Sequence, residues 1–277
     1  MALSHYIPGS LGVKNASPPP PGVWWENYHQ FYNAKKVKDS DRSTVHGLGF
    51  DLNVYGNISH VAWITEKKMI GGNYGVDIFV PFVYTDIKTK ATGVDEDTFG
   101  LGDIFIDPIV LTWYGKRVEG FFAAGAYIPT GKHHKASSPG RGYWTFMEQL
   151  GGTYYFDEAK TWTASLRGRL LQSTEDPDTN ITPGRELILE YGVGKDFLIS
   201  NNVKMTIGAG GYSYWQTSDD DGPDALNSRF SGHALGPEIQ FTFFKPFLNV
   251  ALRYIPEYQV KNATEGRSLS LVFIGGF

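Results

Sequence analysis

The chain closes with the stretch Leu269-Ser270-Leu271-Val272-Phe273-Ile274-Gly275-Gly276-Phe277. The odd-numbered positions of this stretch carry Leu, Leu, Phe, Gly and Phe, whereas the even-numbered positions carry Ser, Val, Ile and Gly. Side chains of a β-strand alternate between two faces with a period of two. The stretch therefore predicts a β-strand with one continuous apolar face.

A terminal apolar strand that ends in phenylalanine resembles the assembly signal of bacterial outer-membrane barrels. In this chain Phe273 and Phe277 would carry that signal. The resemblance implies that the barrel assembly machinery is a partner and that outer-membrane lipid and lipopolysaccharide surround the protein. A soluble barrel can also end on an apolar strand, so the decision depends on the sequence upstream.

Composition narrows the class of protein. The chain has 277 residues, no cysteine and a net charge of −4, which excludes disulfides and gives no sign of a nucleic-acid partner. Aromatic residues make up 15% and glycine contributes 33 residues, which favours strands and turns. The mean hydropathy of −0.27 is compatible with a transmembrane barrel, because only alternate residues meet lipid. No basic and apolar export signal opens the chain, and we expect that such a signal was removed.

Segments with alternating or aromatic-rich patterns predict about twelve strands, an even number as bacterial barrels require. They are Val23–Asn33, Val45–Thr65, Asn73–Lys88, Leu101–Tyr114, Val118–Pro129, Tyr143–Phe156, Thr161–Ser173, Arg185–Ile199, Val203–Thr217, Phe230–Phe243, Phe247–Tyr258 and Ser268–Phe277.

The connectors between these strands alternate in length. Short ones such as 115–117 and 200–202 are followed by long polar ones, namely 34–44, 89–100, 130–142, 174–184, 218–229 and 259–267. Outer-membrane barrels sort their connections in this way, with short periplasmic turns and long extracellular loops. We therefore predict an all-β fold, a transmembrane antiparallel up-and-down barrel of residues 23–277, in the bacterial outer membrane and working as a monomer.

Residues 1–22 stand apart from this pattern. They end in Ser17-Pro18-Pro19-Pro20-Pro21-Gly22, and four consecutive prolines cannot join a sheet. The segment is either a disordered tail or an extended lead segment that docks at the periplasmic mouth and narrows it. His5, Tyr6, Ile7 and Leu11 give it side chains that can pack.

Charged residues within the strands indicate which face lines the lumen. An Arg or Lys on the lipid face at mid-bilayer would cost about 2–4 kcal/mol, so these side chains are expected to point inward. The predicted lumen network is Asp77, Asp103, Arg167, Arg169, Glu190, Glu238 and Arg253.

The same parity argument places large apolar side chains inside. Asp77, Asp107, Glu119 and Glu148 serve as the inward reference on four strands. The predicted solute path then consists of Phe79, Pro81, Phe105, Phe121, Tyr127, Trp144 and Phe146, with Ile109 also inside. These rings either pack a small barrel or form a hydrophobic stripe opposite the charged wall.

At this point the chain resembles an outer-membrane channel family named for the meta-pathway of phenol degradation. The resemblance is carried by His5-Tyr6-Ile7-Pro8-Gly9, the Pro-Gly lead into Trp24-Trp25, Gly100-Leu101-Gly102-Asp103, Tyr127-Ile128-Pro129-Thr130-Gly131 and Tyr143-Trp144-Thr145-Phe146. It implies a twelve-stranded barrel with a hydrophobic interior, passive uptake of hydrophobic, often aromatic, small molecules, and a lead segment that belongs to the architecture. No cofactor is implied.

Two alternatives stay open: an outer-membrane barrel enzyme, or a structural barrel with a closed lumen. Ser231 and His233 share a strand face and are the best catalytic pair, but parity places them outward and no supporting acid is evident. His133-His134 lies beside Lys132 and Lys135, which favours a solvated loop over a metal site. The run Asp219-Asp220-Asp221 lacks the spacing of an EF-hand. We therefore predict no catalytic residue and no metal.

Overall fold

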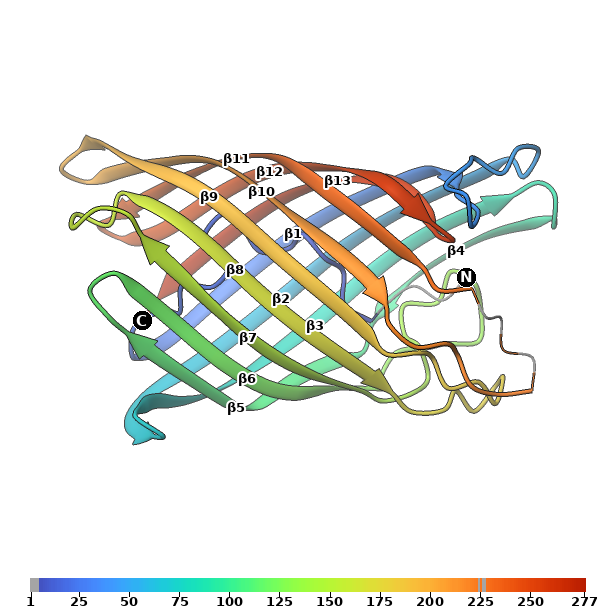
Figure 1. Ribbon diagram of the computed structural model, residues 1–277, viewed down its shortest axis with the longest axis horizontal. Coiled ribbons are helices and arrows are strands. Elements are labelled where there is room, and N and C mark those ends of the chain that lie inside the picture. Colours follow the sequence, from blue (N-terminus) through green and yellow to red (C-terminus); the bar gives the residue numbers. More distant parts are fainter. Residues whose placement is uncertain (1–4, 224, 226–227) are drawn as a thin grey trace.

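The computed structural model describes residues 5–223, 225 and 228–277. The predicted lead segment of residues 1–22 thus has its first four residues outside the described part, as does part of the predicted loop 218–229. The described residues form antiparallel strands arranged as one closed sheet (Figure 1). Their bounds are β1 Gly22–Val37, β2 Phe50–Met69, β3 Gly72–Thr89, β4 Val94–Leu101, β5 Ile104–Tyr114, β6 Val118–Ile128, β7 Thr145–Tyr155, β8 Trp162–Ser173, β9 Glu186–Ser200, β10 Val203–Gln216, β11 Ser231–Phe244, β12 Phe247–Lys261 and β13 Thr264–Gly276.

The sheet closes into a barrel because β1 pairs with both β2 and β13, the last strand. Strands β4 and β5 both pair with β3 and are two parts of one wall position, interrupted at Gly102 and Asp103. The result is a twelve-stranded up-and-down barrel, which confirms the predicted fold. Among the residues that the structure describes, no helix is long and apolar enough to cross a membrane.

Short turns gather at one end of the barrel and long loops at the other, called here the short-turn end and the long-loop end (Figure 1). Two predicted long loops are wrong in detail, because most of 89–100 and 259–267 is strand. The acidic run that begins at Val94 forms β4, and Asp95 pairs with Lys88 of β3 at 3.1 Å. These two hairpins therefore lengthen the wall at the long-loop end instead of forming open loops.

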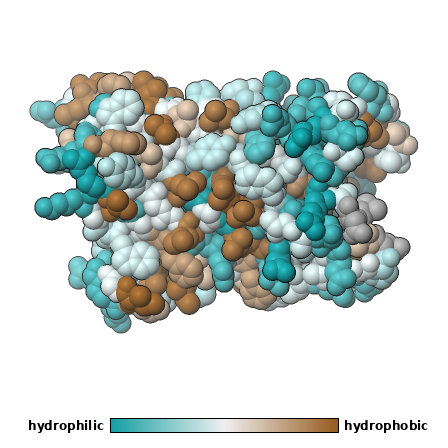
Figure 2. All heavy atoms as spheres, viewed as in Figure 1, coloured by the Kyte–Doolittle hydropathy of each residue, from teal (hydrophilic) through white to brown (hydrophobic). Residues whose placement is uncertain are grey.

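Alternation along each strand separates two faces. Outward side chains include Leu150, Leu166 and Leu170, each at least 55% exposed. Figure 2 shows hydrophobic side chains gathered over the middle of the visible face, and mostly hydrophilic ones at the long-loop end. The face of β13 that carries Phe273 points outward with the other apolar positions, whereas Val272 and Ser270 point inward and are buried.

Candidate functional site

The lumen is occupied by the lead segment, whose described part runs from His5 to the start of β1 at Gly22. The blue trace of this segment lies inside the barrel in Figure 1. Its first described residue bonds Thr145 and Asp103 at the long-loop end, and Pro19 accepts a hydrogen bond from Tyr114 at the short-turn end. The sequence predicts that the segment docks at the periplasmic mouth. In the structure it instead passes along the length of the lumen, from the long-loop end to the short-turn end.

Asp103 holds the segment at the long-loop end of the barrel. His5 Nε2 lies 2.8 Å from Asp103 Oδ2, and the same carboxylate accepts backbone N–H groups from Gly131 at 2.9 Å and Arg141 at 2.7 Å. The His5 ring also stacks on Tyr127, with centroids 4.9 Å apart. One buried carboxylate thus ties together the lead segment, the break between β4 and β5, and the loop 129–144.

This junction brings together three of the sequence motifs that are far apart in the chain: those around His5, Asp103 and Gly131. Tyr143 of the same loop meets the His5 ring edge-on at 5.1 Å. Burial raises the pKa of Tyr143 to about 12, so its phenol stays neutral at physiological pH. Tyr143 therefore packs on His5 as an uncharged ring.

Two glutamates hold the middle of the lead segment. Glu190 accepts hydrogen bonds from the Tyr6 hydroxyl and from the Gly9 amide, each at 2.9 Å. Glu238 accepts the Val13 amide at 3.0 Å. Backbone donors that would otherwise lie buried without water are satisfied in this way, which fixes the path of the segment.

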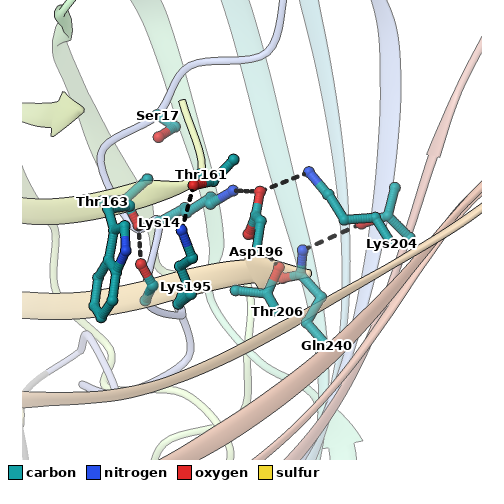
Figure 3. A network of polar contacts seen from close by, with 12 residues as sticks. Lys14, Ser17, Thr161, Thr163, Lys195, Asp196, Lys204, Thr206 and Gln240 are labelled. Atoms are coloured by element: carbon teal, nitrogen blue, oxygen red, sulfur yellow. Dashed lines mark hydrogen bonds and ion pairs between the residues drawn. The ribbon is translucent and has the colours of Figure 1, made fainter. Parts of the chain in front are cut away.

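The lower part of the segment is held by an ion pair from Lys14 to Asp196 at 2.7 Å, drawn in Figure 3. Asp196 of β9 also pairs with Lys204 at 3.0 Å and accepts the Thr206 hydroxyl at 2.7 Å. Nearer the short-turn end, the Ser17 hydroxyl donates to Thr153 at 2.9 Å. The segment is thus anchored at three positions along the lumen by carboxylates: Asp103 in the break between β4 and β5, Glu190 of β9 with Glu238 of β11, and Asp196 of β9.

Glycines on the wall and on the segment allow the two to approach closely. A Cβ at Gly192 of β9 would lie 2.5 Å from the Val13 Cα, and one at Gly12 would lie 2.4 Å from Glu238 Oε1. Both distances are far below ordinary contact, so larger side chains would push segment and wall apart. Gly192 is therefore a seat for the lead segment.

All seven charged residues predicted for the lumen point inward. Arg253 Nε donates to Glu238 Oε2 at 2.6 Å, and Arg169 pairs with Glu190. Asp77 approaches His60 Nε2 at 3.5 Å. The seven are Asp77, Asp103, Arg167, Arg169, Glu190, Glu238 and Arg253.

The charges do not form a wall opposite the aromatic residues. The Arg167 guanidinium lies 4.0 Å from the centre of the Phe121 ring, and the Arg169 guanidinium lies at the same distance over the Tyr6 ring. Cations and rings therefore contact each other directly, and the expected division of the lumen into two sides is wrong.

The predicted aromatic path is found in part. Phe79, Phe105 and Tyr127 point inward and follow one another in space, with ring centroids 5.8 Å apart for Phe79 and Phe105 and 4.6 Å apart for Phe105 and Tyr127. Pro81 and Phe121 also point inward. Phe105 is only 2% exposed and belongs to a buried cluster against which Tyr6 of the lead segment packs. These rings therefore line the space that the lead segment occupies.

Trp144 and Phe146 do not line the lumen, and that prediction is wrong. Phe146 is 54% exposed on the outer face, since its neighbour Thr145 is the buried partner of Tyr127. The parity argument takes Glu148 of β7 as inward, but the inward residue is Gln149, which donates to Asp107 at 2.9 Å and accepts from Arg169 at 3.0 Å. The buried network decides the face, and Glu148 is left outside.

Ile109 is also outward, because the register of β5 shifts between Ile106 and Ile109. This bulge includes Pro108 and reverses the alternation, a local event that a period-two pattern does not anticipate. Among the residues that sequence reasoning missed are Gln149 and His60, which stacks on Phe79 at 3.7 Å. His60 carried a signal, since an ionisable residue inside an apolar strand favours the lumen.

The residues considered for catalysis do not assemble with each other. His233 points outward, as predicted, and its Nδ1 lies 2.8 Å from Ser213 Oγ instead of Ser231. In the acidic loop, Asp219 pairs with Arg229 at 2.8 Å, and Asp220 accepts the Gly184 amide at 2.8 Å. These carboxylates therefore hold neighbouring loops together.

Comparison with solved structures agrees on the fold. The chain resembles the crystal structure of the COG4313 outer membrane channel from Pseudomonas putida F1, with a TM-score of 0.81 and 15% identity over 98% of this chain and 100% of that one. It also resembles the transport unit of the autotransporter AIDA-I from Escherichia coli, with a TM-score of 0.58 and 11% identity over 92% and 90%. The translocator domain of the autotransporter NalP from Neisseria meningitidis gives 0.52 and 14% over 94% and 90%.

No curated protein matches the sequence significantly. A family model described as "Putative MetA-pathway of phenol degradation" matches residues 34–273, which is most of the chain. The fold is that of outer-membrane barrels, and the family assignment covers nearly the whole wall of this one. The chain belongs to the family of the MetA pathway of phenol degradation.

Proposed function

We propose that the protein is an integral outer-membrane channel for passive uptake of small hydrophobic, mainly aromatic, solutes, with the lead segment as a resident plug. The observation that carries this proposal is the inward run of rings from Phe79 through Phe105 to Tyr127, lying against the segment. Membership of a family named for phenol degradation supports it. In this orientation the short-turn end faces the periplasm and the long-loop end faces outside.

An apolar solute gains free energy by leaving water for this run of rings. Covering about 100 Å² of apolar surface is worth roughly 2.5 kcal/mol. The gain falls along these rings, where Tyr6 of the lead segment now packs against the buried cluster that contains Phe105. Passage therefore requires the Tyr6 region to move aside, and the solute replaces contacts that the segment made.

The anchors differ in a way that suits such movement. The first part of the segment is held by His5 on Asp103, by the Arg169 guanidinium over the Tyr6 ring, and by hydrogen bonds to Glu190, whereas Lys14 makes an ion pair with Asp196 nearer the short-turn end. We propose that the upper part of the segment moves while the lower part stays attached to the wall. The outer wall meets lipid and lipopolysaccharide, the assembly machinery recognises the last strand, and the channel works as a monomer without a cofactor or a catalytic centre.

The test uses cells in which the gene is deleted and then restored. Uptake of a labelled monoaromatic hydrocarbon should fall on deletion and return with the wild-type chain. The variant Phe79→Leu keeps an apolar side chain and should restore uptake, whereas Phe79→Asp places a carboxylate on the path and should not. Heat-modifiable gel migration establishes that both variants are folded. Equal uptake with a folded Phe79→Asp variant contradicts the hydrophobic path.

A structural barrel with a closed lumen is the second candidate, and one observation favours it. Phe105 is almost completely buried in a cluster on which Tyr6 of the segment packs, and carboxylates hold the segment at three positions along the lumen. This reading expects no change in uptake on deletion of the gene, and no conductance from the wild-type chain in planar bilayers. Restored uptake of the aromatic solute excludes it.

A further inference from the structure

Two extracellular loops bring three metal-ligating side chains together. His133 and His134 come from the loop 129–144, and Asp178 comes from the loop 174–185. His134 Nδ1 lies 2.9 Å from Asp178 Oδ2, and His133 Nε2 lies 3.6 Å from the same oxygen. The ligand atoms all lie within 4.8 Å of one another.

Adjacent histidines can share a point here because they use different nitrogen atoms. His133 extends its distal Nε2 and His134 its proximal Nδ1 toward one carboxylate, and the two ring centroids are 4.1 Å apart. Gly142 provides the seat for His133, since a Cβ at Gly142 would lie 2.5 Å from the His133 ring. The pair is therefore placed by the fold of the loop and not only by its sequence.

Both loops also make contacts that do not use the three ligand side chains. The loop of the histidines is anchored where Gly131 and Arg141 donate to Asp103. On the other loop, the Asp178 amide donates to Asp176 Oδ1 at 2.9 Å, which closes a turn around the ligand. The arrangement thus needs little ordering when a cation arrives.

We propose that His133, His134 and Asp178 form a Zn²⁺ site that links the two loops. Zinc favours imidazole nitrogen and carboxylate oxygen in a tetrahedral arrangement, with bonds of about 2.0–2.2 Å and ligand atoms therefore about 3.3 Å apart. The distances of 2.9 and 3.6 Å bracket that spacing, so side-chain adjustment suffices. Water takes the fourth position.

The sequence suggests that the flanking lysines disfavour a metal ion, but the facing loop offsets their charge. Lys132 and Lys135 bring two positive charges, but Asp176 and Asp178 of the facing loop bring two negative ones. The carboxylate from the second loop supplies both a ligand and charge compensation, and sequence spacing gives no hint of it. The site is separate from the solute path, so it does not depend on the proposed uptake function.

Zinc binding is measured by isothermal titration of the folded full chain in detergent with zinc chloride. The wild-type chain should bind one Zn²⁺ at a saturable site. Asp178→Asn and His133→Gln should lose that site, whereas His46→Gln, an exposed histidine on the loop 38–49, should keep it. No saturable binding by the wild type overturns the proposal, as does binding retained in both Asp178→Asn and His133→Gln.

A second measurement tests the link between loops. Zn²⁺ should slow tryptic cleavage at Lys132 and Lys135 in the wild type but not in Asp178→Asn. Cleavage at Lys90, at the tip of the β3–β4 hairpin, is the internal control for trypsin activity in the same zinc solution. Protection that is equal in Asp178→Asn, or absent in the wild type, shows that the loops are not joined by the metal and overturns the bridging site.

Discussion

Gly192→Ala should loosen the plug without disturbing the barrel. The nearest atoms to a Cβ at this position all belong to Val13, at 2.5, 2.7 and 2.9 Å. Ordinary contact begins at 3.4 Å, so Val13 must retreat by about 0.9 Å. The three nearest atoms all belong to the lead segment, so the added methyl group acts first on that segment.

The magnitude follows from the bond that this movement breaks. The Val13 amide donates to Glu238 at 3.0 Å, and a retreat of that size along the bond stretches it to about 3.9 Å, beyond hydrogen-bonding distance. A hydrogen bond to a charged group contributes about 1.5–3 kcal/mol. The ratio of plugged to open channels should therefore fall by about 10- to 150-fold, because each 1.4 kcal/mol corresponds to about tenfold.

The assay is single-channel recording in planar bilayers, with a chain that lacks residues 1–20 as the open reference. Gly168→Ala is the matched control, because Gly168 of β8 points outward and its Cβ would have ordinary contacts, the nearest at 3.5 Å. Gly192→Ala should raise the open fraction at least about tenfold, and Gly168→Ala should not. Equal open fractions in folded wild type and Gly192→Ala refute the reasoning that this seat holds the plug.

Three further outcomes are expected. Asp103→Asn should speed hydrogen exchange in the 130–142 peptide at least about tenfold, as measured by mass spectrometry. The substitution weakens hydrogen bonds worth about 1.5–3 kcal/mol each, which hold both this loop and His5. Unchanged exchange argues against this anchor. Arg253→Met leaves Glu238 buried and unpaired, so the free energy of unfolding in urea should fall by about 3–5 kcal/mol, and an unshifted midpoint is the contrary result. Hydrogen bonds from Thr161 and Trp162 lower the pKa of Asp157 below its ordinary 3.8. The stabilisation from this carboxylate is therefore complete above pH 3.8 and is lost as the pH falls through the lower folded-state pKa. In Asp157→Asn the melting temperature should fall less steeply than in the wild type between pH 5 and about 2.5, and an equally steep fall would contradict this.

The sequence was sufficient for the barrel, because alternation is a local property of each strand. The face of Arg167 and Arg169 follows from their spacing alone, and both residues point inward. The final strand likewise shows its apolar face in the residues around Phe273. The predicted loop 89–100 is mostly the strand β4, because a polar acidic run can pair as a strand when its partner strand extends far enough.

Tertiary structure decided what the local pattern leaves open. The face of β7 depends on Gln149 meeting Asp107 and Arg169 on other strands, so a single charge at Glu148 pointed to the wrong side. The course of the lead segment depends on carboxylates of distant strands, which no spacing within residues 1–22 encodes.

The junction at His5 shows the same division. The motif around each partner is visible in the sequence, but the contact of His5 with Asp103, 98 positions further along the chain, requires the closed barrel. The third ligand of the proposed zinc site, Asp178, is likewise 44 residues from His134. Strand periodicity is fixed by neighbours along the chain, whereas the contents of the lumen and the contacts between loops are fixed by which strands close the ring, and that information is not local.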